Sequence, residues 1–244
     1  MKILILCLFL FSLSCSKSND VLDPEGMPKV DSIEDSRKLK EVWKTYKTEI
    51  LKHQKGDFML NPPATAAQIA DFEKLIKNKL PEDLKEFYLI ANGQKYESEY
   101  SIVRPGFNLM PLEECTKAIE GLKPRSGKKM SSGLSEMMGV KFNQHGVKDE
   151  YDWLDKWIPI ATDHFGNYLC IDYDPAKGGK AGQLISVYFD DVGRNIFAYS
   201  VKGHFAFIEK GLKEGSLKFH EEVGPYTLED IKEFERIDKE NEEL

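Results

Sequence analysis

The sequence has little that would support a membrane span or a nucleic-acid surface. After the first fourteen residues, no apolar run approaches the roughly 20 residues that a membrane-spanning helix needs. The 244 residues carry a formal net charge of −7. Lysine and arginine are not gathered into the basic patch that neutralises phosphates. We therefore expect a soluble chain after residue 14 and no nucleic-acid partner.

Cysteine is scarce, with four residues in the chain. Cys7 lies within the apolar segment at the start of the chain, and Cys15 lies just after that segment. Cys115 and Cys170 are therefore the two cysteines of the folded part. Neither is flanked by cysteine or histidine at the spacing of a metal site. An oxidising compartment would permit the two to form a disulfide, whereas buried free thiols are at least as compatible with the sequence.

Recognised catalytic motifs are absent as well. The chain has no HExxH zinc motif, no GxSxG nucleophile turn and no GxxxxGK[ST] phosphate loop. Asp172 and Asp174 stand two residues apart at the end of an apolar run and form a possible cation site, but aspartate is common where a strand enters a turn. We predict no catalytic residue, no metal and no cofactor. A hydrolase with an unrecognised site is the minority alternative.

The start of the chain has the pattern of an export signal. Lys2 precedes a short apolar run that ends in a small residue and Cys15. The residues up to Cys15 resemble the lipobox of bacterial lipoproteins, although Ser12 replaces the usual large aliphatic residue. We predict a signal peptide over residues 1–14, lipidation of Cys15, a tether over residues 15–36 and a lipid-anchored place in the cell envelope. A plain secretory signal is the alternative.

Apolar residues recur at helical spacing through much of the first half. Thr65 and Gln68 form a capping box, which marks the start of one helix at Ala66. Asn92-Gly93 is typical of a helix C-terminal cap. Helices are predicted over residues 37–51, from 66 to about 79, from 81 to about 91, and over 111–122.

Short β-rich runs and turns dominate the second half. After a long loop over residues 126–149, strands are predicted at 157–161, 168–173, 183–189 and 195–199, the first two paired antiparallel. A closing helix contains Phe205, Ile208 and Leu212. We predict one α+β domain over residues 37–215, with a mostly antiparallel sheet packed by helices, and an acidic helical extension over 216–244.

Several short motifs occur along the chain in a fixed order. They are Pro62-Pro63-Ala64-Thr65, Ile69, Phe72-Glu73, Leu80-Pro81-Glu82-Asp83, Phe87-Tyr88, Asn92-Gly93, Trp157-Ile158-Pro159-Ile160-Ala161, Gly166-Asn167, Leu169-Cys170-Ile171-Asp172, Pro175, Gly182-Gln183, and Phe205 with Ile208. In this order they resemble the SUKH superfamily, also called the Smi/Knr family, over roughly residues 37–215. The resemblance implies an α+β scaffold that binds proteins and has no catalytic constellation.

The family resemblance also suggests a role. Bacterial members are viewed as immunity proteins against polymorphic or contact-dependent toxins, and fungal members regulate cell-wall assembly. Many family members look cytoplasmic, whereas this chain has an export signal. Its partner would therefore be met outside the inner membrane. We predict an immunity-type protein whose partner is a toxin or an envelope protein. A regulatory or structural envelope lipoprotein is the alternative.

Five residues are candidates for contact with that partner. Trp153 could be partly exposed, whereas Trp157 precedes an apolar strand and reads as core. The predicted loops around Asp163, His164, Asp190 and Asp191 would form an acidic surface for a basic partner. We therefore take Trp153 and these four loop residues as the predicted binding site.

Overall fold

The computed structural model describes residues 32–104, 106–130, 146–189, 194–220 and 224–227. The predicted signal peptide, Cys15, most of the predicted tether and the segment 228–244 lie outside the described residues. None of the described helices is both long and apolar enough to cross a membrane.

The helices begin and end close to where the sequence places them. They are α2 (Leu39–Ile50), α3 (Ala66–Ile76), α4 (Glu82–Tyr88), α5 (Leu112–Leu122), which continues into the short 3₁₀ helix η1 (Lys123–Arg125), and α7 (Val201–Glu214). At the start of α3 the predicted capping box is present: the Thr65 hydroxyl accepts the N–H of Gln68, and the Gln68 side chain accepts the N–H of Thr65.

One predicted cap is wrong. Helix α4 ends at Tyr88, several residues before Asn92-Gly93. These two residues instead connect to the start of α5. Asn92 Oδ1 accepts the N–H of Leu112 at 3.0 Å, and a Cβ on Gly93, whose φ is +73°, would lie 2.5 Å from the carbonyl carbon of Met110. The glycine is needed for this close approach between backbones.

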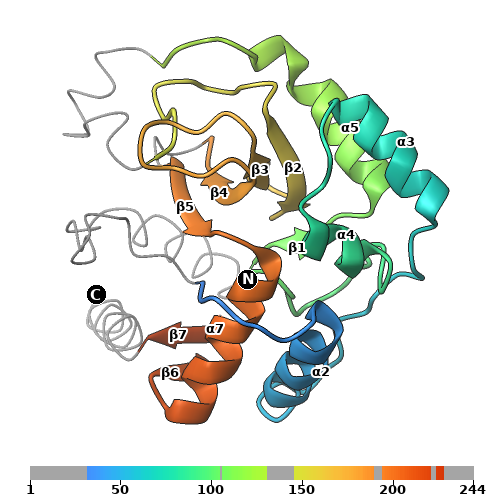
Figure 1. Ribbon diagram of the computed structural model, residues 1–244, viewed down its shortest axis with the longest axis vertical. Helices are drawn as coiled ribbons and strands as arrows, with labels where there is room; N and C mark the ends of the chain where they lie inside the picture. Colours follow the sequence, from blue (N-terminus) through green and yellow to red (C-terminus); the bar gives the residue numbers. More distant parts are fainter. Residues whose placement is uncertain (1–31, 105, 131–145, 190–193, 221–223, 228–244) are drawn as a thin grey trace, which may run out of the picture.

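The main sheet is a five-stranded antiparallel meander (Figure 1). Its strands, in spatial as well as chain order, are β1 (Asn108–Leu109), β2 (Trp157–Thr162), β3 (Tyr168–Asp172), β4 (Gln183–Val187) and β5 (Arg194–Ala198). The predicted α+β class and the β2–β3 hairpin are confirmed. Strand β1 was not predicted, because two residues carry no readable period.

A second, smaller sheet replaces the beginning of the predicted acidic extension. Strands β6 (Leu217–His220) and β7 (Gly224–Thr227) pair as an antiparallel hairpin. Leu217 is buried against α7, close to Gly211. Helical prediction is therefore wrong for this stretch, where one buried leucine on a short strand fixes the hairpin against the preceding helix.

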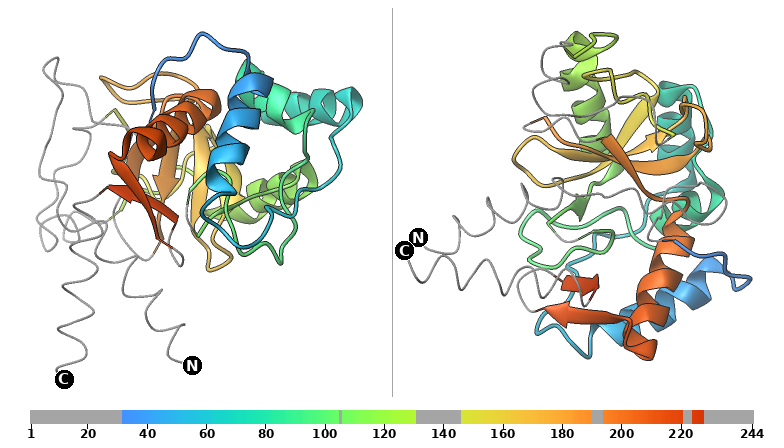
Figure 2. Two further views of the ribbon diagram at one scale, coloured as in Figure 1. Left: turned by 90° about the horizontal axis from the view of Figure 1, so that it is seen from below. Right: turned by 90° about the vertical axis from the view of Figure 1, so that its left-hand side faces the viewer.

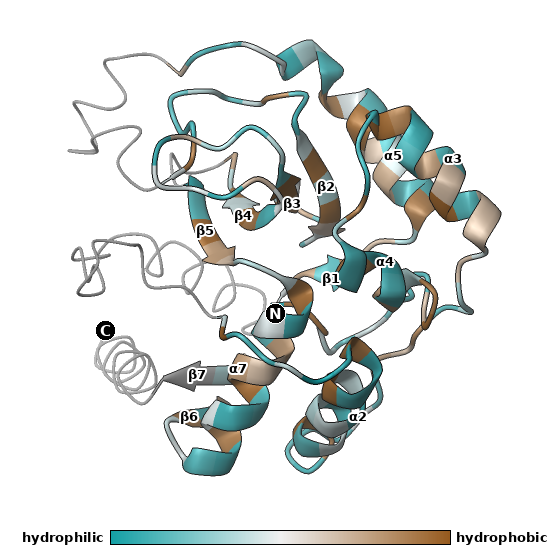
Figure 3. Ribbon diagram, in the orientation of Figure 1, coloured by the Kyte–Doolittle hydropathy of each residue, from teal (hydrophilic) through white to brown (hydrophobic). Residues whose placement is uncertain are grey.

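The helices divide into two groups that flank the sheet. Helices α2 and α7 pack on each other at one end of the molecule, and α3 packs on α5 at the other, where α5 also contacts β2 (Figures 1 and 2). Helix α4 contacts both α2 and α7. In Figure 3 strand β2 is largely hydrophobic, as expected for a strand with helices packed beside it.

The larger core is centred on an aromatic cluster that joins three helices. The Trp43 ring of α2 lies 4.9 Å from Phe87 of α4, edge to face, and 5.3 Å from Phe205 of α7. Tyr46 stacks on Phe205 at 4.6 Å, and its hydroxyl donates to the carbonyl of Ile102 at 3.0 Å. Such pairs add about 0.5–1.5 kcal/mol each beyond the area they bury.

A second core covers the other face of the sheet. It contains Trp157, Cys170 and Ile185, which alternate along their strands with residues of the larger core. Trp153 belongs to this second core: it is 2% exposed, and its ring meets Trp157 edge to face at 5.9 Å. The prediction that Trp153 is partly exposed is wrong, because the loop that carries it folds over the sheet.

The end of the predicted tether is attached to α7. The N–H of Ile33 donates to the carbonyl of Gly203 at 3.1 Å, and Lys202 Nζ donates to the carbonyl of Asp35 at 2.7 Å. The Arg37 guanidinium bridges Asp35 and the buried Glu209, with N···O distances of 2.6 and 2.9 Å. Residues 32–36 therefore lie on the domain and are not part of a free tether.

Two glycines in helices test this attachment. A Cβ on Gly203 would lie 2.4 Å from Ser32 Oγ, whereas one on Gly121 in α5 would meet no atom within 4 Å. We expect Gly203→Ala to lower the free energy of unfolding by about 1–2 kcal/mol by displacing residues 32–33. The matched Gly121→Ala should raise it by up to about 1 kcal/mol. Urea titration measures both, and equal effects would contradict the proposed crowding.

Candidate binding site

The turn between β2 and β3 is held by its own side chains. Asp163 is 8% exposed, and its Oδ1 accepts the N–H groups of Phe165 and Asn167 at 2.8 and 2.9 Å. Its Oδ2 accepts Nδ2 of Asn167 at 2.8 Å. The Thr162 hydroxyl accepts the N–H of His164, whose φ is +64°. These bonds fix the backbone of the turn in one conformation.

This arrangement corrects one part of the predicted acidic surface. The charge of Asp163 is directed into the turn, so this carboxylate is not available to a partner. Asp190 and Asp191 lie outside the described residues, and Trp153 is buried. Of the five predicted binding residues, His164 is the one that the described structure places at the surface.

Aromatic side chains occupy the surface where the acidic site was expected. Phe165 is 76% exposed and Tyr96 is 73% exposed. The His164 ring lies 4.3 Å from the Tyr96 ring, tilted by 62°. Met59, 40% exposed, adjoins Tyr96 because its carbonyl accepts the N–H of Lys95. We call Met59, Tyr96, His164 and Phe165 the hairpin tip.

The hairpin tip holds half of the large apolar side chains that are exposed in the described structure. The full set is Leu51, Met59, Leu75, Leu89, Tyr96 and Phe165. Exposed aromatic rings on a rigid turn lose little conformational entropy on binding, which makes them suitable anchors for a protein contact. The exposure of Phe165 could have been predicted, because the sequence places this aromatic residue between the turn-forming residues Asp163 and Gly166. No comparable sequence pattern marks Tyr96 as exposed.

Charge around the hairpin tip is modest. Burial lowers the pKa of His164 below its usual value, which favours the neutral form of the ring. Its Nε2 lies 3.4 Å from Nδ2 of Asn108. Glu97 and Glu99 are exposed in the loop that carries Tyr96, and neither forms an ion pair within the described residues. The surface is thus aromatic, with an acidic border.

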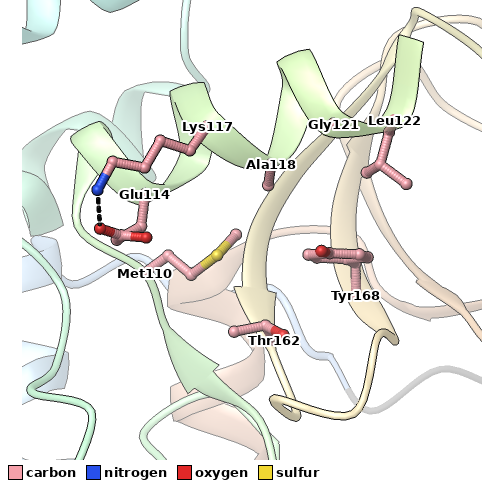
Figure 4. A pocket seen from close by; sticks show the side chains of 8 residues that line it. All are labelled: Met110, Glu114, Lys117, Ala118, Gly121, Leu122, Thr162 and Tyr168. Carbon is pink, nitrogen blue, oxygen red and sulfur yellow. Dashed lines mark hydrogen bonds and ion pairs between the residues drawn. The ribbon is translucent and has the colours of Figure 1, made fainter. Parts of the chain in front are cut away.

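A groove lies on the α5 side of the same hairpin (Figure 4). Its volume is about 390 Å³, within the usual range for binding pockets. One wall is α5, and Thr162 and Tyr168 from β2 and β3 face it. We call this the α5 groove; it is lined by Met110, Glu114, Lys117, Ala118, Gly121, Leu122, Thr162 and Tyr168.

The possible cation site at Asp172 and Asp174 has another structural role. Asp172 is fully buried, and its oxygens accept the N–H of Asp174 and Nε2 of Gln183, both at 2.9 Å. Asp174 pairs instead with Lys148 at 2.7 Å. Within the described residues no three acidic, histidine or cysteine side chains gather as metal ligands would. The pair therefore closes a turn.

The buried Asp172 makes stability depend on pH. Burial raises the pKa of this carboxyl to about 6, above that of the unfolded chain. The folded protein therefore takes up a proton as pH falls through 6, and stability from this group rises as pH falls and is lost as pH rises.

We expect the wild type to gain about 1 kcal/mol from Asp172 between pH 7 and pH 5, a gain that Asp172→Asn lacks. Urea titrations of both proteins at the two pH values measure the difference. A constant offset between them would show that Asp172 does not titrate in this range.

The two remaining cysteines are free thiols. Cys115 and Cys170 are both buried and are not joined. Burial raises the pKa of each thiol, to about 12 for Cys115, so neither is a nucleophile at neutral pH. Of the two alternatives left by the sequence, the structure shows buried thiols.

Comparison with known proteins gives a consistent assignment. The model of the SMI1 / KNR4 family (SUKH-1) matches residues 63–202. KNR4/SMI1 homolog 1 of Debaryomyces hansenii is 32% identical over 230 residues, covering 71% of this chain and 50% of its own length. The cell wall biosynthesis/cell cycle regulator smi1 of Schizosaccharomyces pombe is 24% identical over 159 residues, 62% of this chain and 31% of its own length.

A third relative shows similar coverage. The cell wall assembly regulator SMI1 of Saccharomyces cerevisiae is 25% identical over 155 residues, 52% of this chain and 31% of its own length. The chain thus spans half or less of the curated relatives that it matches.

Proposed function

Since the chain belongs to the SMI1 / KNR4 family (SUKH-1), we propose that it acts by binding another protein and not by catalysis. The hairpin tip is the observation that carries this proposal. Phe165 stands on a turn that Asp163 holds rigid, and Tyr96, from a separate loop, packs against His164 of that turn; both rings are largely exposed. Rings placed in water contribute little to folding but much to a contact that desolvates them.

The proposed setting is the cell envelope. Residues 1–14 have the pattern of an export signal, and Cys15 stands where a lipoprotein is acylated. The attachment of residues 32–36 to α7 leaves a tether of up to about 16 residues between Cys15 and the domain, which spans roughly 50 Å when extended. A protein anchored in this way meets partners near the membrane surface.

For the partner, we favour a toxin that reaches the cell from outside, which makes this an immunity-type protein. The support is the family resemblance together with the export signal. The names of the fungal relatives favour a second candidate, a regulatory role in cell-wall assembly. In both roles the domain binds a protein, so one binding experiment on the hairpin tip applies to both.

The test of binding uses the full chain with an affinity tag, recovered from its native envelope fraction with bound proteins identified by mass spectrometry. We expect Tyr96→Ala combined with Phe165→Ala to reduce recovery of a stoichiometric partner at least tenfold. Stability should change by less than about 0.5 kcal/mol per site, because both rings lie in solvent.

Leu75→Ala is the matched control, since Leu75 is a 40% exposed apolar residue on α3. It should leave recovery unchanged. Equal recovery by the double variant and the wild type would exclude the hairpin tip as the binding surface. A toxin among the recovered proteins supports the immunity role, and cell-wall machinery supports the regulatory one.

The anchor is tested separately with Cys15→Ser. In detergent phase separation, the wild-type chain from cells should enter the detergent phase, because acyl chains contribute about 0.8 kcal/mol per buried methylene group. The Cys15→Ser chain should stay in the aqueous phase. Aqueous partition of both proteins, with an unmodified mass at Cys15, would contradict lipidation.

A further inference from the structure

We propose that the α5 groove receives an extended segment of a partner protein, with an aliphatic side chain seated between α5 and Tyr168. This inference rests on the proposed protein-binding function and names a second contact beside the hairpin tip. It also predicts the chemistry of the segment: a basic residue, an aliphatic residue and an acidic residue in succession along α5.

Gly121 is the first observation. Glycine weakens the interior of a helix relative to alanine, so a helical glycine usually has a steric or conformational reason. Gly203 and Gly211 in α7 have such a reason, because a Cβ on either would collide with neighbouring atoms. A Cβ on Gly121 would meet nothing within 4 Å, yet this residue lines the α5 groove. Its bare backbone allows a second chain to approach α5 closely.

Tyr168 is the second observation. Its ring is half-buried against Trp153 and Phe189, and its side chain projects into the α5 groove (Figure 4). No described residue forms a hydrogen bond with its hydroxyl, although the neighbouring Thr162 hydroxyl is occupied by the N–H of His164. A phenol at the wall of an open groove can both donate to and accept from a peptide backbone.

The shape of the groove favours a peptide segment as its occupant. Its lining residues on α5 run from Glu114 to Leu122, a distance of about 12 Å at 1.5 Å per residue. An extended chain covers this length with about three or four residues. Ala118 is the apolar contact midway along this length, with Met110 toward the Glu114 end and Leu122 at the other, and a single aliphatic side chain fits there between α5 and the hairpin.

Charge along α5 specifies the ends of the segment. Glu114 lines the groove at the Met110 end, and Lys123 follows the last residue of the helix at the other end. A segment with a basic residue near Glu114 and an acidic residue near Lys123 complements both ends. Because the Lys117–Glu114 and Lys123–Glu120 pairs are exposed, a partner can compete for these charges at small cost.

The groove and the hairpin tip are parts of one surface. Thr162 lines the groove, and its hydroxyl holds the backbone of His164 at the tip. Tyr168 follows the same turn on β3. A partner that covers Phe165 can therefore place a neighbouring segment along α5 without crossing another element.

The test selects displayed random 12-residue peptides on the full chain carrying Cys15→Ser, and measures the affinity of enriched peptides by titration. We expect the enriched sequences to share an aliphatic residue between a basic and an acidic one. Gly121→Leu, which fills the groove, should weaken binding at least tenfold, and Tyr168→Phe several-fold. Lys74→Leu, an exposed change on the neighbouring helix α3 outside the groove, should alter affinity less than twofold.

Thermal unfolding of Gly121→Leu serves as the folding control, and its midpoint should equal or exceed that of the starting protein. The inference is overturned if no peptide is enriched over the bare matrix, or if enriched peptides bind Gly121→Leu as tightly as the starting protein. If the groove fails while Tyr96→Ala with Phe165→Ala still abolishes partner recovery, the proposed function stands without the groove. If partner recovery fails and the peptides bind as expected, the groove stands as a peptide site by itself.

Discussion

Burial of the central sheet on both faces is the constraint on which the rest of the structure depends. Ile158, Ile171 and Leu184 face the aromatic core of α2, α4 and α7, while Trp157, Cys170 and Ile185 face the loop that carries Trp153. Neither face is free for a partner. Recognition must therefore use turns, edges and the helices beside them, and both surfaces inferred here lie where the β2–β3 hairpin leaves the covered part of the sheet.

At the turn between β2 and β3 the charged side chain of Asp163 is buried and the apolar ring of Phe165 is exposed. A carboxylate that faces solvent would attract a basic partner, but this one accepts three hydrogen bonds from its own turn. The same bonds hold Phe165 in water, where folding alone would not place it. The side chains exposed at this turn are therefore aromatic, with Glu97 and Glu99 beside them as an acidic border.

The sequence allowed most of the elements to be predicted, since helical spacing, the Thr65–Gln68 box and runs of β-branched residues are local signals. It did not allow prediction of features that depend on distant contacts. Trp153 is buried because its loop returns over β2 and β3, and Tyr96 joins the hairpin tip because its ring meets His164 from another part of the chain. The sequence does not single out Gly121, because only the structure shows that a Cβ at this position would meet no neighbouring atom.

Residues that the fold does not require are the best guide to function in a chain without a catalytic motif. Through most of this domain the residue at each position suits both its secondary structure and its packing. Positions where it does not are often functional sites. Gly121 weakens a helix without relieving a collision, Tyr96 and Phe165 place rings in solvent, and Tyr168 offers a hydroxyl without a described partner. All four lie on α5, on the β2–β3 hairpin or against it. Independent exceptions that gather on one side of a protein are better explained by a shared partner than by four separate accidents of folding.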